Sequence, residues 1–317
     1  MSVASRVSRK DFFTDEEWEP LSARSSWKGL ALVAHCWAVI GLTWAAVIWS
    51  PHLLGVFWPI TIIPAAMIIG GRQLGLGILM HDAAHGCLHP NQKVNDWVAE
   101  WLCAEGVERY RKYHLQHHKF AQQAEDPDLI LSAPFPITRN SLWRKVVRDL
   151  TGQTWVKQRF GVMQAKLKKR EPGQPVLPIV AGEIWRMRRW FGLNLAVIAI
   201  TSAFGYWWAW FALWLLPRAT WFQLITRLRN IAEHALVAKD EPDPLRHART
   251  TTASLIERAL LAPYYVNYHC EHHMFMHMPC WSLPRAHRLL KAKGVLERMR
   301  TAPNYAAVIG EAAGKAA

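Results

Sequence analysis

Histidines gathered in four short segments restrict the fold of this chain more than any other feature of its sequence. The segments are HDAAH at 81–85, HLQHH at 114–118, NIAEHA around His234 and HCEHH at 269–273, and they hold nine of the fifteen histidines. Spacings of three and four residues place the imidazoles of a segment on one face of a helix. A tetrahedral metal uses four ligands, so nine converging histidines indicate two metals. The chain must therefore fold so that four distant segments meet.

Long apolar runs add a second restriction, because runs of this length are typical of helices that cross a bilayer. The predicted spans are about 30–49, 52–70, 190–204 and 206–228, arranged as two hairpins. Arg218 falls inside the last of these, which leaves the start of the fourth span open. The fold class that we predict is all-α: a polytopic membrane protein with four transmembrane helices and a cytoplasmic helical cap that carries a histidine-rich di-iron site.

The histidine segments also predict the topology. If the four segments share metals, the chain between them must cross the membrane an even number of times. The two expected outer turns, 50–54 and 203–206, hold no Lys or Arg, whereas the side with the histidines holds nearly all of them. Both termini and the segments 71–189 and 229–290 are therefore expected in the cytoplasm. Residues 1–28 form a cytoplasmic lead-in, 29–290 the membrane domain and 291–317 a C-terminal tail.

The charge and the cysteines exclude other classes of protein. A formal net charge of +14 is expected of cytoplasmic loops beside a membrane, so no nucleic-acid partner is predicted. Residues 139–170 are strongly basic, and their apolar side chains recur at helical spacing, as in an amphipathic helix on anionic lipid. Five cysteines without a CxxC pair favour reduced thiols over a disulfide framework.

The ligand set points to oxygen chemistry on a lipid. No glutamate is followed three residues later by histidine, which excludes the ExxH motif of soluble di-iron bundles, and the HExxH motif of zinc proteases is also missing. An all-histidine site at the rim of a membrane bundle implies a substrate that arrives from the bilayer. Iron with O₂ as co-substrate is the combination able to attack an unactivated C–H bond.

These motifs resemble those of the membrane-bound fatty acid desaturase superfamily, whose signature is HxxxH, HxxHH and HxxHH with membrane hairpins between them. The resemblance runs from about residue 50 to 290 and includes HHKFAQQAEDPDL and NYHCEHHMFMHMPCWSLPRAH, which are similar to bacterial fatty acid desaturases. It implies a bacterial inner-membrane location and two Fe ions. The implied ligands and catalytic residues are His81, His85, His114, His117, His118, His269, His272 and His273.

The resemblance further implies a ninth ligand. Acyl-CoA desaturases of this superfamily carry an NxxxH segment whose histidine binds metal and whose asparagine holds a metal-bound water. Asn230 and His234 fit that spacing. The histidine segments HDAAH, HLQHH and HCEHH are the histidine boxes of this superfamily. The first box, HDAAH, has three residues between its histidines, whereas animal acyl-CoA desaturases have four. This shorter spacing groups the chain with acyl-lipid desaturases, carotenoid ketolases and related hydroxylases.

Carboxylates near the boxes are candidates for orienting the histidines, because a metal-bound imidazole usually gives its other N–H to a carboxylate or carbonyl. The favoured residues are Asp126, Asp128 and Glu271, with Asp82, Glu125 and Glu233 as further candidates. His89, His277 and His287 lie near the boxes but outside the pattern, so they are expected to be structural.

The function that follows is an O₂-dependent desaturase that inserts a double bond into a fatty acyl chain. The alternative is a hydroxylase or ketolase of the same superfamily, acting on alkanes, carotenoids or other lipids; the non-enzyme alternative is a membrane metal-binding or transport protein. The chain has no dinucleotide fingerprint, HPGG haem motif or cysteine pair, so electrons must come from an external donor. A ferredoxin, or a cytochrome b5-like protein with its reductase, would fit. The oligomeric state is left open.

Overall fold

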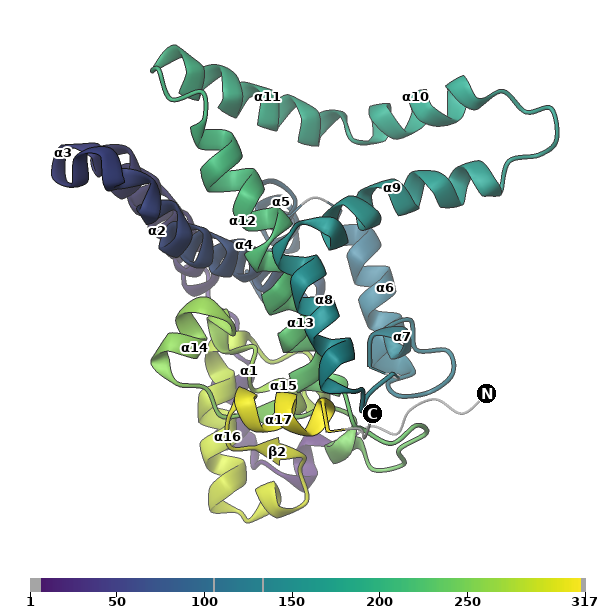
Figure 1. The fold of residues 1–317 in the computed structure, drawn as a ribbon. Helices are drawn as coiled ribbons and strands as arrows, with labels where there is room; N and C mark the ends of the chain where they lie inside the picture. Colours follow the sequence, from purple (N-terminus) through teal and green to yellow (C-terminus); the bar gives the residue numbers. More distant parts are fainter. Residues whose placement is uncertain (1–6, 105, 133, 315–317) are drawn as a thin grey trace. The chain divides into compact units, whose positions relative to one another are not determined.

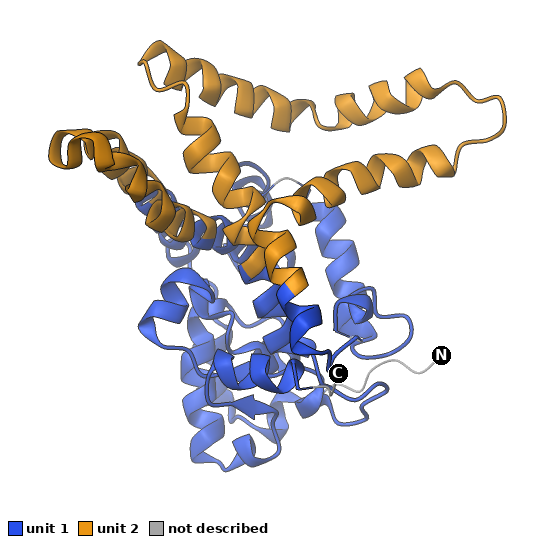
Figure 2. Ribbon diagram, viewed as in Figure 1, with its two compact units in different colours: residues 1–39, 71–143, 225–317 blue, residues 40–70, 144–224 orange. Residues whose placement is uncertain are grey.

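The computed structural model describes residues 7–104, 106–132 and 134–314, and it divides the chain into two compact units. Unit 1 comprises residues 1–39, 71–143 and 225–317, and unit 2 comprises 40–70 and 144–224 (Figure 2). The predicted lead-in 1–28 and tail 291–317 each include terminal residues, 1–6 and 315–317, that lie outside the described part of the chain.

The described chain is mostly helical, as predicted, and its strands are a single short parallel pair (Figure 1). The helices are α1 (Asp15–Ser22), α2 (Lys28–Trp49), α3 (Pro51–Leu54), α4 (Ile62–Ala84), α5 (Gln92–Val98), α6 (Val107–Lys119), α7 (Leu129–Ser132), α8 (Arg139–Leu150), α9 (Gln153–Lys168), α10 (Val176–Arg186), α11 (Arg188–Ala203), α12 (Leu216–Ala219), α13 (Trp221–His234), α14 (Leu255–Leu260), α15 (His269–Met274), α16 (Leu283–Ala292) and α17 (Tyr305–Ala312). The strands are β1 (Thr250–Thr251) and β2 (Thr301–Ala302), with Thr250 opposite Thr301.

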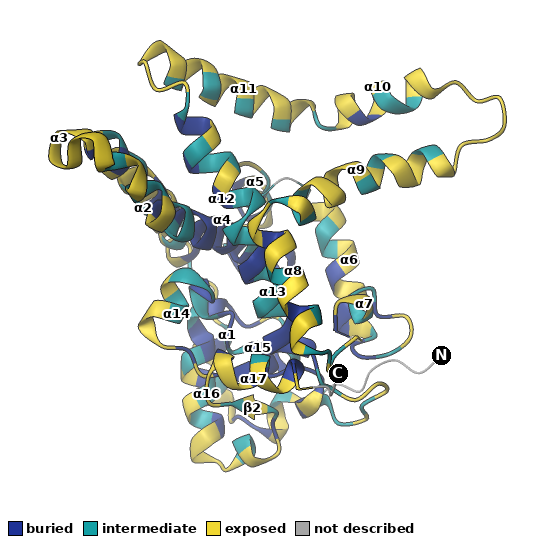
Figure 3. Cartoon of the chain, in the orientation of Figure 1, coloured by how far each residue is buried: buried dark blue, intermediate teal, exposed yellow. Residues whose placement is uncertain are grey.

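In unit 2, the end of α2 and the start of α4 pack against the segment before α12. Val47, Ala65 and Leu213 belong to one buried apolar cluster, and the indole of Trp44 donates a hydrogen bond to the carbonyl oxygen of Leu213 at 3.1 Å. Helices α9 and α10 form an antiparallel pair that leads into α11 (Figure 1). The outer faces of α3 and α11 are exposed and apolar (Figure 3).

The predicted spans agree only partly with these helices. Among the described residues, one helical segment, Lys28–Ala84, is long and apolar enough to cross a membrane. The predicted first span, 30–49, lies inside α2. The predicted second span begins too early, because Gly55 has a φ of +52° and Pro59 interrupts the regular helix, so that α4 starts at Ile62 and continues to Ala84.

The second predicted hairpin is more broken. Helix α11 has 16 residues and covers the predicted third span, 190–204, except for its last residue. The predicted fourth span, 206–228, is divided into a π-helical segment Phe211–Leu215, then α12, and then α13 after a break at Thr220. The described residues therefore do not confirm four transmembrane helices, and the four-span topology stays a proposal.

In unit 1, two buried clusters set the positions of the histidine segments. Val33 of α2 packs with Leu79 and Ala83 of α4 and with Val107 at the start of α6. A second cluster joins Phe13, before α1, to Met274 of α15 and Leu290 of α16. The predicted tail contains β2 and α17, and Tyr305 and Val308 of α17 are buried.

Candidate metal centre

Three of the histidine segments lie at the C-terminal ends of helices in unit 1, and the fourth makes up most of the short helix α15. His81 is in the last turn of α4 and His85 follows that helix directly. His117 and His118 are in the last turn of α6, and His234 is the final residue of α13. His272 and His273 close α15. The nine histidines named by the sequence therefore come from the C-terminal ends of three helices and from the short helix α15.

Five of these histidines form one group, called here the five-histidine group: His81, His85, His114, His118 and His272. Their ligand atoms all lie within 4.8 Å of one another, and all five side chains are buried. The Nε2 atom of His118 is 2.9 Å from Nε2 of His114 and 3.1 Å from Nε2 of His272. The Nε2 atoms of these three rings thus face a common centre.

The remaining histidines form the four-histidine group: His117, His234, His269 and His273. The Nε2 atoms of His117 and His273 are 3.3 Å apart, and those of His234 and His269 are 2.9 Å apart. His234 belongs to two overlapping sets of potential ligands, one with His117 and His273 and one with His269 and Glu233. The structure brings together every histidine that the sequence assigned to the metals.

The donor set fits metal ions. Two nitrogens that bind one metal at right angles, each at about 2.1 Å, lie about 3 Å apart, which is the spacing observed here. The ring nitrogens of His81 and His85 are buried, and none of them has a hydrogen-bond partner among the described residues. Burial, reinforced by neighbouring imidazoles, lowers the pKa values of His114, His118 and His272 well below their usual range. These rings are neutral at physiological pH, which is the form that binds metal.

Asp126 contacts His117 on the side of the ring that faces away from the other histidines. Its Oδ1 lies 2.7 Å from Nδ1 of His117, the nitrogen that faces away from the other histidines, and both side chains are buried. The other carboxylate oxygen accepts a hydrogen bond from the backbone N–H of Gln122 at 2.9 Å. This geometry is that of a carboxylate that orients a metal ligand.

The other favoured carboxylates take different positions. The carboxylate of Asp128 lies 3.7 Å from Nδ1 of His117 and accepts a hydrogen bond from the hydroxyl of Tyr113. Glu271 contacts Thr250 and His287, with 2.5 Å between its Oε1 and Nδ1 of His287. Glu271 thus joins α15 to β1 and α16.

Asn230 and two further acidic candidates also have defined places. The amide oxygen of Asn230 accepts a hydrogen bond from Nη2 of Arg229 at 2.8 Å. Asp82 accepts a hydrogen bond from the backbone N–H of Cys280 at 3.0 Å, which ties the end of α4 to the segment after α15. Glu125 is exposed. Nδ1 of His277 lies 3.4 Å from the carbonyl oxygen of His85, so this histidine borders the site through the backbone.

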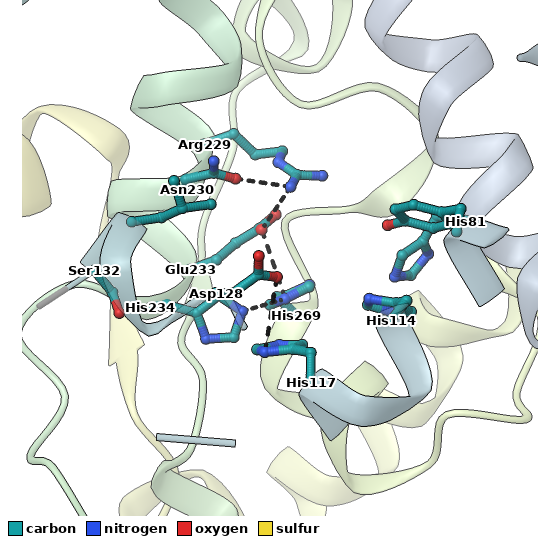
Figure 4. A pocket seen from close by; sticks show the side chains of 12 residues that line it. His81, His114, His117, Asp128, Ser132, Arg229, Asn230, Glu233, His234 and His269 are labelled. Atoms are coloured by element: carbon teal, nitrogen blue, oxygen red, sulfur yellow. Dashed lines mark hydrogen bonds and ion pairs between the residues drawn. The ribbon is translucent and has the colours of Figure 1, made fainter. Parts of the chain in front are cut away.

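A cavity of about 30 Å³ opens beside the histidines, as Figure 4 shows. Its lining includes Tyr110, Ser132, Arg229 and Glu233 in addition to box histidines. Tyr110 stacks on His114 with 5.3 Å between ring centroids, and its position four residues before His114 is a signal that could have identified it. Ser132 carries no such signal, because the chain brings α7 to the site only by folding.

Glu233 differs from the other carboxylates in the direction that it faces. Its Oε2 lies 3.5 Å from Nε2 of His269 and 3.3 Å from Nη2 of Arg229. Burial raises the pKa of Glu233 to about 7, against the opposing effect of Arg229. Arg249, which is also buried, donates to the carbonyl oxygens of Ala232 and Ala235 and so fixes the end of α13 that carries Glu233 and His234.

Comparisons with known proteins agree with this site. The family described as fatty acid desaturase matches residues 58–301, a range that contains all four histidine segments. Dihydrorhizobitoxine desaturase of Bradyrhizobium elkanii is 25% identical over 244 residues, which cover 71% of this chain and 66% of that protein. The aligned region is thus slightly less than two thirds of the relative's length. The resemblance drawn from the histidine boxes is confirmed: the chain belongs to the fatty acid desaturase family.

Proposed function

We propose that this protein is a membrane-bound, O₂-dependent desaturase that uses a di-iron centre to insert a double bond into the acyl chain of a lipid. The observation that carries the proposal is the convergence of nine histidines into a five-histidine and a four-histidine group. Two groups of neutral imidazoles match two metals with nitrogen ligands. Membership of the family supports an oxidoreductase and a desaturase-like reaction.

The residues of the chain would prepare the site for that reaction. Two irons, when bound, would supply with O₂ the oxidising power to remove hydrogen from adjacent methylene groups. The histidine rings would hold both metals from buried helix ends, and Asp126 would keep His117 in the tautomer whose Nε2 faces the metal. The cavity beside His81 and Glu233 would admit a reacting group next to the metals.

The membrane topology is proposed on the exposure of apolar side chains. Val56 and Phe57 are 85% and 76% exposed, and Leu195 and Phe204 on and after α11 are 62% and 75% exposed. Apolar surface of this kind favours contact with lipid over contact with water. We propose two hairpins of two spans each, with the irregular fourth span extended across Phe211–Leu215 and α12, and with the histidine groups and both termini in the cytoplasm of a bacterial inner membrane.

The substrate class and the outcome of the reaction are parts of the same proposal. A lipid acyl chain fits a site supported by membrane helices, whereas the relative in Bradyrhizobium elkanii is named for dihydrorhizobitoxine. Hydroxylation or ketolation of an alkane, carotenoid or other lipid is the second candidate, because both outcomes begin with removal of the first hydrogen. Which of the two reactions follows depends on the position of one substrate carbon relative to the metals.

Electrons would come from a separate carrier. The sequence contains no motif for a flavin, haem or iron–sulfur cofactor of its own. A ferredoxin, or a cytochrome b5-like protein with its reductase, would dock on the basic cytoplasmic side, where acidic carriers are attracted by the positive charge.

The test is expression of the protein in a host that lacks unsaturated fatty acids, with a compatible electron donor, followed by gas chromatography and mass spectrometry of its lipids. We expect new alkenes in the lipid fraction and roughly two irons per purified chain. A His272→Ala variant should insert in the membrane and yield no product. The matched control is His52→Ala, because His52 is exposed and lies outside the histidine groups.

Two results would contradict the proposal in different ways. A hydroxylated or ketone product without alkene would assign the second candidate. Zinc or copper retained after iron-replete expression, with no lipid product, would favour a membrane metal-binding or transport protein instead.

A further inference from the structure

We propose that Glu233 is a direct carboxylate ligand of the metal in the four-histidine group, so that this position is bound by four imidazoles and one carboxylate. The inference rests on the proposed di-iron function and goes beyond its all-histidine ligand set. It replaces the role that the family resemblance implies for Asn230, a metal-bound water, with a ligand from the protein itself.

The first argument is the side of the imidazole that Glu233 faces. A carboxylate that orients a histidine lies at the nitrogen away from the metal, as Asp126 does at Nδ1 of His117. Glu233 instead lies 3.5 Å from Nε2 of His269, and that nitrogen is 2.9 Å from Nε2 of His234. The carboxylate is therefore among the converging nitrogens (Figure 4).

The second argument is the burial of a carboxylate that lacks hydrogen bonds. Glu233 is 2% exposed, and neither carboxylate oxygen has a hydrogen-bond partner among the described residues. Its neighbouring cation is Arg229, at 3.3 Å and shared with Asn230. A buried carboxylate is costly unless it is both paired and hydrogen-bonded or binds a metal, and the ion pair with Arg229 leaves Glu233 without a hydrogen bond. A divalent metal between His234 and His269 would satisfy it.

The third argument is the balance of the two ligand sets. The five-histidine group offers five nitrogens, whereas the second group has four histidines. Glu233 supplies a fifth donor and forms, with His234 and His269, the two-histidine, one-carboxylate combination typical of non-haem iron oxygenases. The amide oxygen of Asn230 already accepts a hydrogen bond from Arg229, and this contact disfavours Asn230 as the fifth donor.

The experiment compares full-length wild-type protein with Glu233→Gln and with Asn230→Ala, each loaded in detergent with isotopically enriched iron. Iron per chain and the Mössbauer spectrum are measured, so the readout does not depend on activity. We expect Glu233→Gln to fall from roughly two irons per chain towards one, or to change the spectrum of one iron only. Asn230→Ala should keep both irons and the wild-type spectrum.

Wild-type iron content and an unchanged spectrum in Glu233→Gln would overturn the assignment, as would loss of iron in Asn230→Ala alone. If Glu233→Gln does not fold, Glu233→Asp decides the question. Its shorter carboxylate should alter the signal of one iron, and an unchanged signal would equally overturn the assignment.

The proposed function can fail separately. A wild-type chain that binds no iron after iron-replete loading would contradict the di-iron function before any variant is compared. A wild-type chain with roughly two irons whose Glu233→Gln variant is unchanged would contradict only the ligand assignment.

Discussion

At the scale of single residues, the position of a carboxylate relative to an imidazole decides what it can do. Asp126 and Glu233 are both buried, and each lies beside a histidine of the four-histidine group. Asp126 contacts the nitrogen that faces away from the metals, whereas Glu233 faces the nitrogen that points towards them. The first residue would set the orientation of a ligand, and the second would be a ligand.

Substitution of Asp126 tests the orienting role. Asp126→Asn removes the negative charge that holds Nδ1–H of His117, so we expect iron affinity to fall by about 10- to 100-fold. Titration of the iron-loaded protein with a chelator measures this change. Glu125→Gln is the matched control, because Glu125 is adjacent in sequence and exposed. Equal iron affinities in both variants would remove Asp126 from the supporting contacts of the site.

The sequence predicts the ligands better than their surroundings. Spacings of three and four residues place eight of the histidines on helix faces before any fold is known, and the resemblance adds His234 through the NxxxH spacing. The contacts of a carboxylate depend on tertiary structure, which is why Glu271, a candidate for orienting a ligand, contacts Thr250 and His287 instead. The sequence names Glu233 as a candidate, but it does not show which nitrogen of the His269 ring the carboxylate faces.

At the scale of helices, close backbone approach fixes the end of α4 and the segment that follows it. A Cβ atom on Gly29 would lie 2.0 Å from the carbonyl oxygen of Leu88, and one on Gly75 would lie 2.7 Å from the ring of Tyr264. Glycine at these two positions lets α2 and α4 meet their neighbours directly. The approach at Leu88 lies three residues after His85, so it supports the first box.

A pair of glycine substitutions on α2 tests this packing. Gly29→Ala should destabilise the protein by about 1–3 kcal/mol, because the added methyl group overlaps backbone that cannot rotate away. Gly41→Ala is the control, since a Cβ atom there meets nothing within 4 Å and alanine favours a helix by up to about 1 kcal/mol. Thermal unfolding in detergent measures both. A melting temperature for Gly29→Ala at or above that of Gly41→Ala would contradict the close approach.

The helices also show where prediction from apolar runs fails. The first predicted span coincides with α2 because an uninterrupted apolar run with few helix breakers forms one regular helix. The second predicted span begins at residue 52, but Gly55 and Pro59 delay the regular helix to Ile62. The break at Thr220 likewise follows from local backbone conformation, with φ −119° and ψ −87°, and hydropathy does not detect it.

At the scale of the whole molecule, the metal site joins segments that are far apart in the chain. His81 and His273 lie far apart in the sequence, yet they belong to the two adjoining groups of potential ligands. A metal that binds the folded chain and not the unfolded chain stabilises the fold by about 2.7 kcal/mol when its concentration is 100 times its dissociation constant. Stability of unit 1 and metal content should therefore change together.

Removal of iron tests this dependence. We expect protein treated with a ferrous chelator to unfold at a lower temperature than iron-loaded protein, and reloading with iron to restore the higher value. Differential scanning calorimetry in detergent measures the shift. The His272→Ala variant should show a smaller shift on chelation than the His52→Ala control. Identical unfolding temperatures with and without iron would show that the histidine groups do not couple metal binding to folding.

The placement of three histidine segments at the C-terminal ends of helices has a consequence for charge. Neutral imidazoles would bring no negative charge to two divalent cations, yet α4, α6 and α13 all end at the site. The aligned peptide dipoles of a helix leave about half an elementary negative charge at its C-terminal end. Three such ends would supply a diffuse counter-charge in addition to that of any carboxylate, and it belongs to the backbone, where side-chain substitution leaves it in place.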